Sequence, residues 1–169
     1  MSWSLELRNG DLTLSGTRLG QVVGSQKLVQ DLRCAIMEQR GHDDMHPKFG
    51  STIDGGRDDQ GREVSGVVGL IDWDYAALTI QSEVQRIAGE YQRRQLARAQ
   101  DDRYRFGEST LSAGELLVSL SNLEFIQAAD TLIVNITLQT GNGREISVSL
   151  PVASGGMGYL QPDNQLVQW

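Results

Sequence analysis

The chain contains one cysteine, two histidines and three prolines among its 169 residues, and only 6% of its residues are aromatic. A single cysteine excludes an intrachain disulfide, so nothing in the sequence points to an oxidising compartment. That residue, Cys34, lies among apolar positions at helical spacing. We therefore interpret it as a small buried hydrophobe rather than as a reactive thiol.

Long apolar runs and an excess of positive charge are also missing. The longest apolar stretches, such as residues 67–71, are far shorter than the roughly 20 residues that span a bilayer. The first residues lack the basic and apolar regions of a signal peptide. A formal charge of −7 argues against general nucleic-acid binding, which needs a concentrated positive surface. We expect a soluble protein made in the cytoplasm, with neither membrane nor nucleic acid as partner.

The N-terminal part is predicted to form a hairpin followed by a short helix. Asn9-Gly10 accepts the positive φ angles of a tight turn and lies between apolar positions that alternate from residue 5 to residue 14. Ser25 is a good N-cap, and Leu28 and Leu32 begin an apolar stripe at helical spacing. We expect both leucines, together with Phe49, to lie in the core.

The middle of the chain is predicted to form one long helix. Asp72 or Asp74 can cap it, and it should run from about Trp73 to Asp102, with Gly107 as its end. Ile80, Val84, Ile87 and Tyr91 repeat in steps of four and three residues, which gives a narrow seam of coiled-coil type. The same register continues to Arg94 and Arg98. The seam and these two arginines are the candidate partner interface; for the arginines, a solvated helix end is the alternative interpretation.

Three segments near the C-terminus alternate as strands do: residues 115–128, 131–139 and 144–152. Thr140-Gly141-Asn142-Gly143 is a hairpin turn between the last two. The predicted fold is therefore α+β: a mostly antiparallel sheet with one apolar face, packed by the short helix and the long helix.

The same sequence patterns predict the domain boundaries. Residues 1–152 are predicted to form one domain, and residues 153–169 a C-terminal extension. Within the domain, residues 41–66 are rich in Gly, Asp and His without periodicity, so we expect a long surface loop that becomes ordered on a partner.

No pattern in the sequence predicts a cofactor, a metal or a catalytic centre. His42 and His46 would present two ligands on one face only in a helix, which Gly41 and Pro47 disfavour. Residues 54–61 fail the calcium-loop pattern, and no nucleophile motif is present. We predict that the protein is not an enzyme and carries no cofactor.

One stretch has a more specific pattern. It reads Gly20-Gln21-Val22-Val23-Gly24-Ser25, then a helix that contains Gln30, Asp31 and Leu32, then Pro47, Phe49 and Gly50 in a P-x-[FY]-G-[ST] exit. This order resembles the small baseplate wedge proteins of contractile phage tails, a family that includes sheath initiators, type VI secretion baseplate subunits and members described as lysozyme-like. The resemblance is specific over roughly residues 11–52 and looser to about residue 152.

The resemblance implies a structural subunit of the virion, assembled in the host cytoplasm and located in the tail baseplate. Such a subunit bundles with other wedge proteins and templates the first sheath ring by strand exchange; its expected partners are wedge subunits, the tail sheath protein, and tail hub or tube proteins. Many family members carry Glu-Pro-Arg at the end of the second helix, where this chain has Glu90-Tyr91-Gln92-Arg93 and the helix continues. The alternatives are a soluble adaptor that binds a partner helix through the seam, and a peptidoglycan hydrolase.

Overall fold

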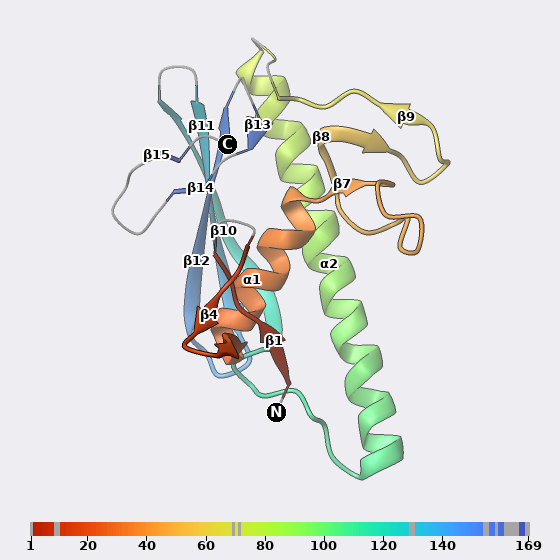
Figure 1. Cartoon of the computed structure of the whole chain (residues 1–169). Coiled ribbons are helices and arrows are strands. Elements are labelled where there is room, and N and C mark those ends of the chain that lie inside the picture. Colours follow the sequence, from red (N-terminus) through yellow and green to blue (C-terminus); the bar gives the residue numbers. More distant parts are fainter. Residues whose placement is uncertain are drawn as a thin grey trace.

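Two helices, α1 (Gly24–Met37) and α2 (Trp73–Phe106), lie against one face of an antiparallel sheet, as Figure 1 shows for this computed structural model. The structure describes residues 2–8, 11–68, 70, 72–128, 131–153, 156–157, 159–160 and 166–167. The predicted α+β class is confirmed. Of the helices in these ranges, neither combines the length and the apolar character that a membrane span needs.

The sheet has the order β10 (Leu117–Ala128), β11 (Thr131–Thr140), β12 (Glu145–Ala153) and β13 (Gly156–Met157). Its register confirms the predicted alternation. Leu132 lies opposite Val152, and Val134 opposite Leu150, with all four side chains buried beneath the helices. The other face is polar, and there Ser149 donates a hydrogen bond to Asn135.

Helix α2 has the predicted start and a somewhat later end. The Asp72 side chain accepts a hydrogen bond from the backbone N–H of Tyr75, and Gly107 closes the helix at a φ of 80°. Ile80, Val84 and Ile87 are at most 4% exposed and belong to the chain's own core, with Tyr91 packed against it. The seam that was expected to bind a partner is therefore buried inside this chain, because α1 and the sheet already cover it.

Helix α1 buries Leu28 and Leu32 as predicted, but it begins one residue earlier than expected. Ser25 is not its N-cap. The first helical N–H, that of Gly24, donates instead to Oε1 of Glu115 at 3.3 Å. A carboxylate distant in the sequence replaces the local cap.

The N-terminal residues form three small antiparallel pairs: β1 (Trp3–Leu5) with β6 (Gln21–Val23), β2 (Leu7–Arg8) with β3 (Asp11–Leu12), and β4 (Leu14–Ser15) with β5 (Arg18–Leu19). The predicted hairpin is present, because Leu7 lies opposite Leu12. Its turn residues, Asn9 and Gly10, lie outside the described residues.

The expectation of a surface loop over residues 41–66 is wrong for its second half. Strand β8 (Ser51–Arg57) lies between β7 (Gln39–Arg40) and β9 (Glu63–Val64), and it buries Ile53. Pattern analysis misses this strand because Gly55 and Gly56 interrupt its alternation. Both glycines have positive φ, and a Cβ on Gly56 would lie 2.5 Å from the Arg40 carbonyl oxygen.

Beyond residue 152 the structure describes Ala153 at the end of β12, then β13 and the pair β14 (Tyr159–Leu160) with β15 (Leu166–Val167). Strand β13 extends the sheet by two residue pairs. The rest of the predicted C-terminal extension lies outside the described residues, so the division into residues 1–152 and 153–169 stays a prediction.

Candidate functional site

A groove of about 310 Å³ lies between α1, residues 91–98 of α2 and the connection before β10. We call it the α1–α2 groove; its lining residues are Lys27, Asp31, Cys34, Phe49, Tyr91, Arg94, Gln95, Arg98, Leu111 and Glu115. It brings together residues of the family-like segment and both arginines of the candidate interface. In the sequence, the residues of that segment and the two arginines are more than 40 positions apart.

One wall of the groove is a contact between the two helices. The hydroxyl of Tyr91 donates a 2.8 Å hydrogen bond to Asp31, whose carboxylate also pairs with Lys27 one turn earlier in α1. Burial raises the pKa of Tyr91, and the neighbouring negative charge of Asp31 raises it further. The phenol is therefore a neutral donor at physiological pH, and Asp31 is engaged within the fold.

The opposite wall is a buried polar junction. Gln95 donates to the Glu115 carbonyl at 2.6 Å and accepts from the Leu117 backbone N–H at 2.9 Å. The Glu115 carboxylate, in a residue 2% exposed, accepts from the Ser2 hydroxyl at 2.5 Å. These groups fix the start of β10 against α2, so they hold the groove open rather than offer ligands.

The rim of the groove is cationic. Arg94 lies over the ring of Phe49, 5.9 Å from its centroid, and its side chain is 57% exposed with Glu90 3.7 Å away. Arg98 is exposed and has no ion pair within 4 Å among the described residues. A partner carboxylate would therefore find positive charge beside an aromatic surface.

Cys34 also lines this groove, half-buried rather than fully buried as predicted. Burial raises the pKa of its thiol, and the charge of Asp31 adds to the effect. The thiolate is disfavoured at neutral pH, which agrees with the interpretation of Cys34 as an unreactive side chain.

The remaining family-motif positions have roles inside the fold. The Gln30 amide accepts from the backbone N–H of Leu7 and donates to the Leu5 carbonyl, at 2.9 and 2.7 Å. This side chain therefore makes the pair of hydrogen bonds to the N-terminal strands that the backbone of a neighbouring strand would make. Leu32 lies in the core, Pro47 is exposed, and Phe49 is half-buried against the core rather than fully inside it.

At Gly50 the chain passes close to the end of α1 and beside α2. The φ of Gly50 is 99°, and a Cβ there would lie 2.5 Å from the Glu38 carbonyl oxygen. Its own carbonyl accepts a 2.7 Å hydrogen bond from Arg86. The glycine of the exit motif is thus required by backbone geometry.

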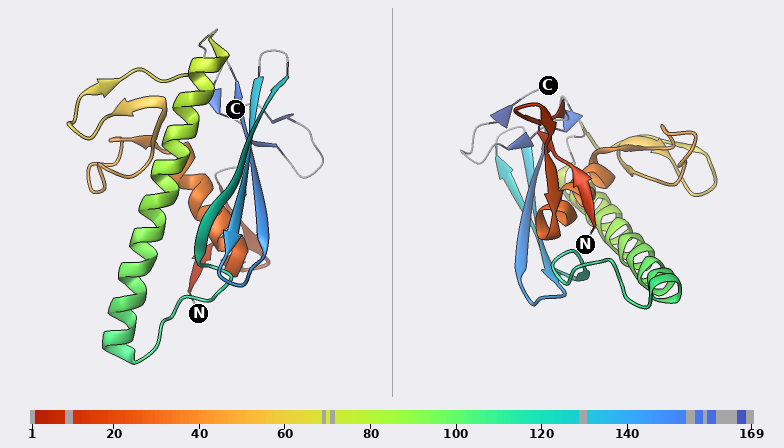
Figure 2. Two further views of the ribbon diagram at one scale, coloured as in Figure 1. Left: turned by 180° about the vertical axis from the view of Figure 1, so that it is seen from behind. Right: turned by 60° about the horizontal axis from the view of Figure 1, so that its bottom comes forward.

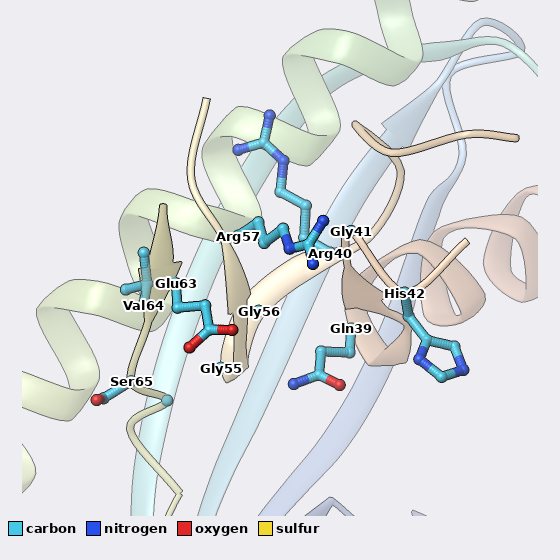
Figure 3. A pocket seen from close by; sticks show the side chains of 11 residues that line it. Gln39, Arg40, Gly41, His42, Gly55, Gly56, Arg57, Glu63, Val64 and Ser65 are labelled. Atoms are coloured by element: carbon cyan, nitrogen blue, oxygen red, sulfur yellow. The ribbon is translucent and has the colours of Figure 1, made fainter. Parts of the chain in front are cut away.

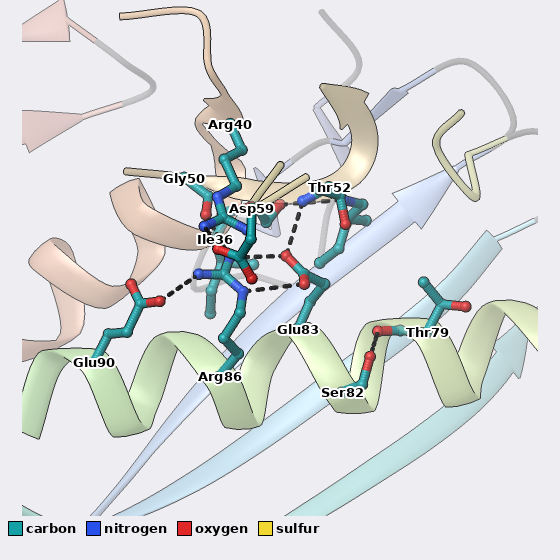
Figure 4. A network of polar contacts seen from close by, with 12 residues as sticks. Ile36, Arg40, Gly50, Thr52, Asp59, Thr79, Ser82, Glu83, Arg86 and Glu90 are labelled. Carbon is teal, nitrogen blue, oxygen red and sulfur yellow. Dashed lines mark hydrogen bonds and ion pairs between the residues drawn. The ribbon is translucent and has the colours of Figure 1, made fainter. Parts of the chain in front are cut away.

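Arg86 is the centre of a polar cluster that sequence patterns did not identify (Figure 4). Its guanidinium binds Glu83 at 2.8 Å and Glu90 at 2.9 Å, and Glu83 accepts a hydrogen bond from the Thr52 backbone N–H. Burial opposes ionisation of Glu83, but these hydrogen bonds outweigh it and lower its pKa. The cluster ties β8 to α2; only the i, i+3 and i, i+4 spacing of these residues could have suggested it.

A second groove, of about 360 Å³, follows the small sheet of β7, β8 and β9 (Figure 3). Its walls are polar and contain Gln39, His42, Arg57 and Glu63, with glycine backbone between them. The other histidine, His46, lies 2.9 Å from Asp43. Among the described residues, no three His, Cys, Asp or Glu side chains are grouped as metal ligands would be.

Two further surfaces are open. The first is the surface of the N-terminal strand pairs, which expose six large apolar side chains: Trp3, Leu7, Leu12, Leu14, Leu19 and Val23. The second is the outer edge of β10, which has β11 as its sole strand neighbour in the described parts of the chain. The start of that edge is closed, because Gln92 donates to the carbonyls of Leu117 and Val118. Residues 122–128 continue in regular register.

Comparisons with protein-family models, with curated proteins and with solved structures found no match for this chain.

Proposed function

We propose that this protein is a structural subunit of a phage tail baseplate wedge, built into the virion in the host cytoplasm. In this role it binds other wedge subunits through the α1–α2 groove and templates the first ring of the tail sheath by strand exchange, close to the tail hub and tube proteins. The proposal begins from the resemblance of residues 11–52 to the wedge and sheath-initiator family.

The observation that carries the proposal is the composition of the α1–α2 groove. Phe49, from the family-like exit motif, lies directly beside the exposed cation of Arg94, with Arg98 at the same rim. Asp31 and Tyr91 satisfy each other within the fold, so the charge left for a partner is positive. This surface suits acidic side chains of a neighbouring subunit, and the chain's net charge of −7 makes a local cationic rim the more distinctive.

Two other surfaces support an assembly role. Six large apolar side chains are exposed on the N-terminal strand pairs, two opposite each other on each pair, and exposed apolar groups of this kind are typical of protein contacts. The regular, unpaired edge of β10 over residues 122–128 offers backbone groups to a strand from another chain. This pairing needs alternate side chains for register and no cofactor.

The test is to delete the gene from its own phage or secretion cluster, supply variants in trans, and image the particles. We expect the parent chain to restore complete baseplates with sheath attached, and the chain itself to be found in purified tails. Complete sheathed tails without the chain would refute the proposal. The adaptor alternative is disfavoured by the burial of Ile80, Val84 and Ile87 in the chain's own core.

A further inference from the structure

The three N-terminal strand pairs meet at one junction, where backbone hydrogen bonds close a triangle. The N–H of Glu6 donates to the Gly20 carbonyl at 2.9 Å, and the N–H of Gly20 donates to the Thr13 carbonyl at 2.8 Å. The N–H of Thr13 completes the triangle by donating to the Glu6 carbonyl at 3.1 Å. The pairs β1–β6, β2–β3 and β4–β5 extend from this triangle as three short arms.

The side chains of the junction residues share one side of the triangle. A Cβ on Gly20 would lie 3.1 Å from the Cβ of Glu6 and 2.5 Å from Oγ1 of Thr13. Neighbouring residues of an extended strand point to opposite faces. The residues that flank the junction on each arm therefore point to the other side of the triangle.

That other side is apolar. The flanking residues lie in directly opposite pairs, and residues opposite each other share a face of a sheet. The pairs are Leu5 with Gln21, Leu7 with Leu12, and Leu14 with Leu19, and Trp3 with Val23 follows on the same face of β1 and β6. We call these eight side chains the N-terminal apolar face. Seven of them are apolar, and the eighth, Gln21, has no charge.

The N-terminal apolar face points to solvent. Six of its side chains are between 36% and 70% exposed, whereas Val22, which points to the opposite side, is buried. The strands that carry the face (red) lie over α1 on the outside of the molecule (Figure 2, right). Together the six side chains expose about as much surface as three whole large apolar residues. Apolar surface of this extent on one face marks a contact site.

The distribution of charge favours a second copy of this chain as the occupant. Residues 2–24 contain two acidic side chains, Glu6 and Asp11, and two basic ones, Arg8 and Arg18. The formal charge of −7 therefore comes from the rest of the chain. Two copies that meet at the neutral N-terminal segment avoid the repulsion between their acidic parts. The same neutrality provides no attraction for a highly charged partner.

The size of the face also suits a dimer. At roughly 100–150 Å² for each fully exposed large apolar side chain, the face offers roughly 300–450 Å² of apolar surface. A standard interface buries about 800 Å² on each partner, of which a little over half is apolar. The N-terminal apolar face therefore supplies most of the apolar area that a stable dimer needs.

We propose that the N-terminal apolar face is the interface of a homodimer in which two copies pack face to face about a twofold axis. A twofold interface uses the same patch on both copies, and an uncharged apolar face is complementary to itself. The backbone triangle, together with the hydrogen bonds from Gln30 to Leu5 and Leu7, holds the arms in place before binding and so lowers the entropic cost of association. The face shares no residue with the α1–α2 groove, and the proposal does not rest on the proposed function.

The oligomeric state of the purified full-length chain tests the proposal. Light scattering after size exclusion should give twice the chain's 18.6 kDa, and the unfolding temperature should rise with protein concentration. Leu14→Glu should weaken the dimer about tenfold or more, because it brings like charges together in an apolar contact. A parent chain that is monomeric at every concentration up to its solubility limit would overturn the proposal.

Leu78→Glu is the matched control. Leu78 is 66% exposed, close to the 70% of Leu14, but it lies on α2, so its substitution should leave the dimer intact. Circular dichroism checks that both variants are folded. Leu14→Ser tests the same contact without an added charge, in case Leu14→Glu lowers the soluble yield, and should also weaken the dimer. A dimer that survives both Leu14 substitutions would mean that the contact lies elsewhere, and the proposal would be wrong.

A lipid surface is the other occupant that an exposed apolar face can take. Cosedimentation with phosphatidylcholine vesicles separates the two. We expect the parent chain to stay in the supernatant as a dimer. If a monomeric chain binds these vesicles and Leu14→Glu abolishes the binding, the face contacts lipid and the homodimer is excluded.

Discussion

The hydroxyl of Tyr91 donates its hydrogen bond to Asp31 and so joins the middle of α2 to the family-like segment of α1. Many members of the family that the sequence resembles carry a Glu-Pro-Arg motif near this point. In this chain the helix continues without a proline, and each residue of Glu90-Tyr91-Gln92-Arg93 has a contact within the fold. The hydrogen bond from Tyr91 to Asp31 therefore holds one wall of the α1–α2 groove without a proline.

Tyr91→Phe should change the response of the fold to alkali. The folded-state pKa of Tyr91 is raised above its ordinary value near 10, so its stabilisation is complete below that pH and is lost as the pH rises further. Denaturant unfolding at pH 8 and at pH 11 should therefore show a larger loss for the parent than for the variant. Equal losses would mean that Tyr91 does not titrate with unfolding; Tyr75→Phe, at an exposed position, is the control.

Two glycines should respond to alanine in opposite ways. Gly50→Ala should destabilise by about 2 kcal/mol or more, because φ is 99° and the new Cβ would collide with the Glu38 carbonyl. Gly89→Ala should stabilise the fold by about 0.5–1 kcal/mol, since the added methyl group meets open space in a regular helix. Urea unfolding measures both changes. If Gly50→Ala were as stable as the parent, the geometric explanation of the glycine in the exit motif would be wrong.

Arg86→Met should destabilise by about 3 kcal/mol, because it leaves Glu83 and Glu90 partly buried without their partner. The destabilisation caused by this substitution should be smaller at acid pH. Because the pKa of Glu83 is lowered in the fold, its ionised form stabilises the fold above about pH 4.3. This stabilisation is lost as the pH falls through the folded-state pKa, so the parent and the variant should approach the same stability there. Unfolding at several pH values measures this. Arg62→Met, which removes an exposed pair with Asp58, should cost under about 1 kcal/mol at any pH.

The sequence predicted those parts of the fold whose signals are local. Asp72 and Gly107 mark the ends of α2 because capping acts within one turn, and alternation predicted β11 and β12 because one face of each is buried. The cap of α1 was missed because Glu115 is 91 residues away from Gly24. No local signal could have predicted it.

The candidate site was predicted in part. Arg94 and Arg98 are exposed at a groove, as expected of a docking surface, and Asp31 and Phe49 lie in the same groove. The apolar seam was assigned to a partner because periodicity tells which residues share a helix face but not what covers that face.

The core leucines should be far more sensitive to truncation than the aromatic of the exit motif. Leu28→Ala and Leu32→Ala should each cost about 2–5 kcal/mol, because both side chains are enclosed. Phe49→Ala should cost less, since its ring is half-buried and faces the groove under Arg94. Thermal unfolding and soluble yield rank the stability of the three variants. If the Phe49 variant were as unstable as the leucine variants, the Phe49 ring would belong to the core.

The double variant Arg94→Ala, Arg98→Ala separates folding from assembly. Exposed charges contribute roughly 0–1 kcal/mol, and the contact of Arg94 with the Phe49 ring lies at the surface, unlike the half-buried cluster of Arg86, so the melting temperature should stay near that of the parent. Incorporation into baseplates should fail, because acidic groups of the partner would be left buried without a counter-charge. Arg62→Ala, Arg144→Ala removes the same charge from exposed positions away from the proposed contact surfaces and serves as the control. If the Arg94, Arg98 variant assembles as well as that control, the rim of the groove is a solvated helix end and partner binding lies elsewhere on the chain.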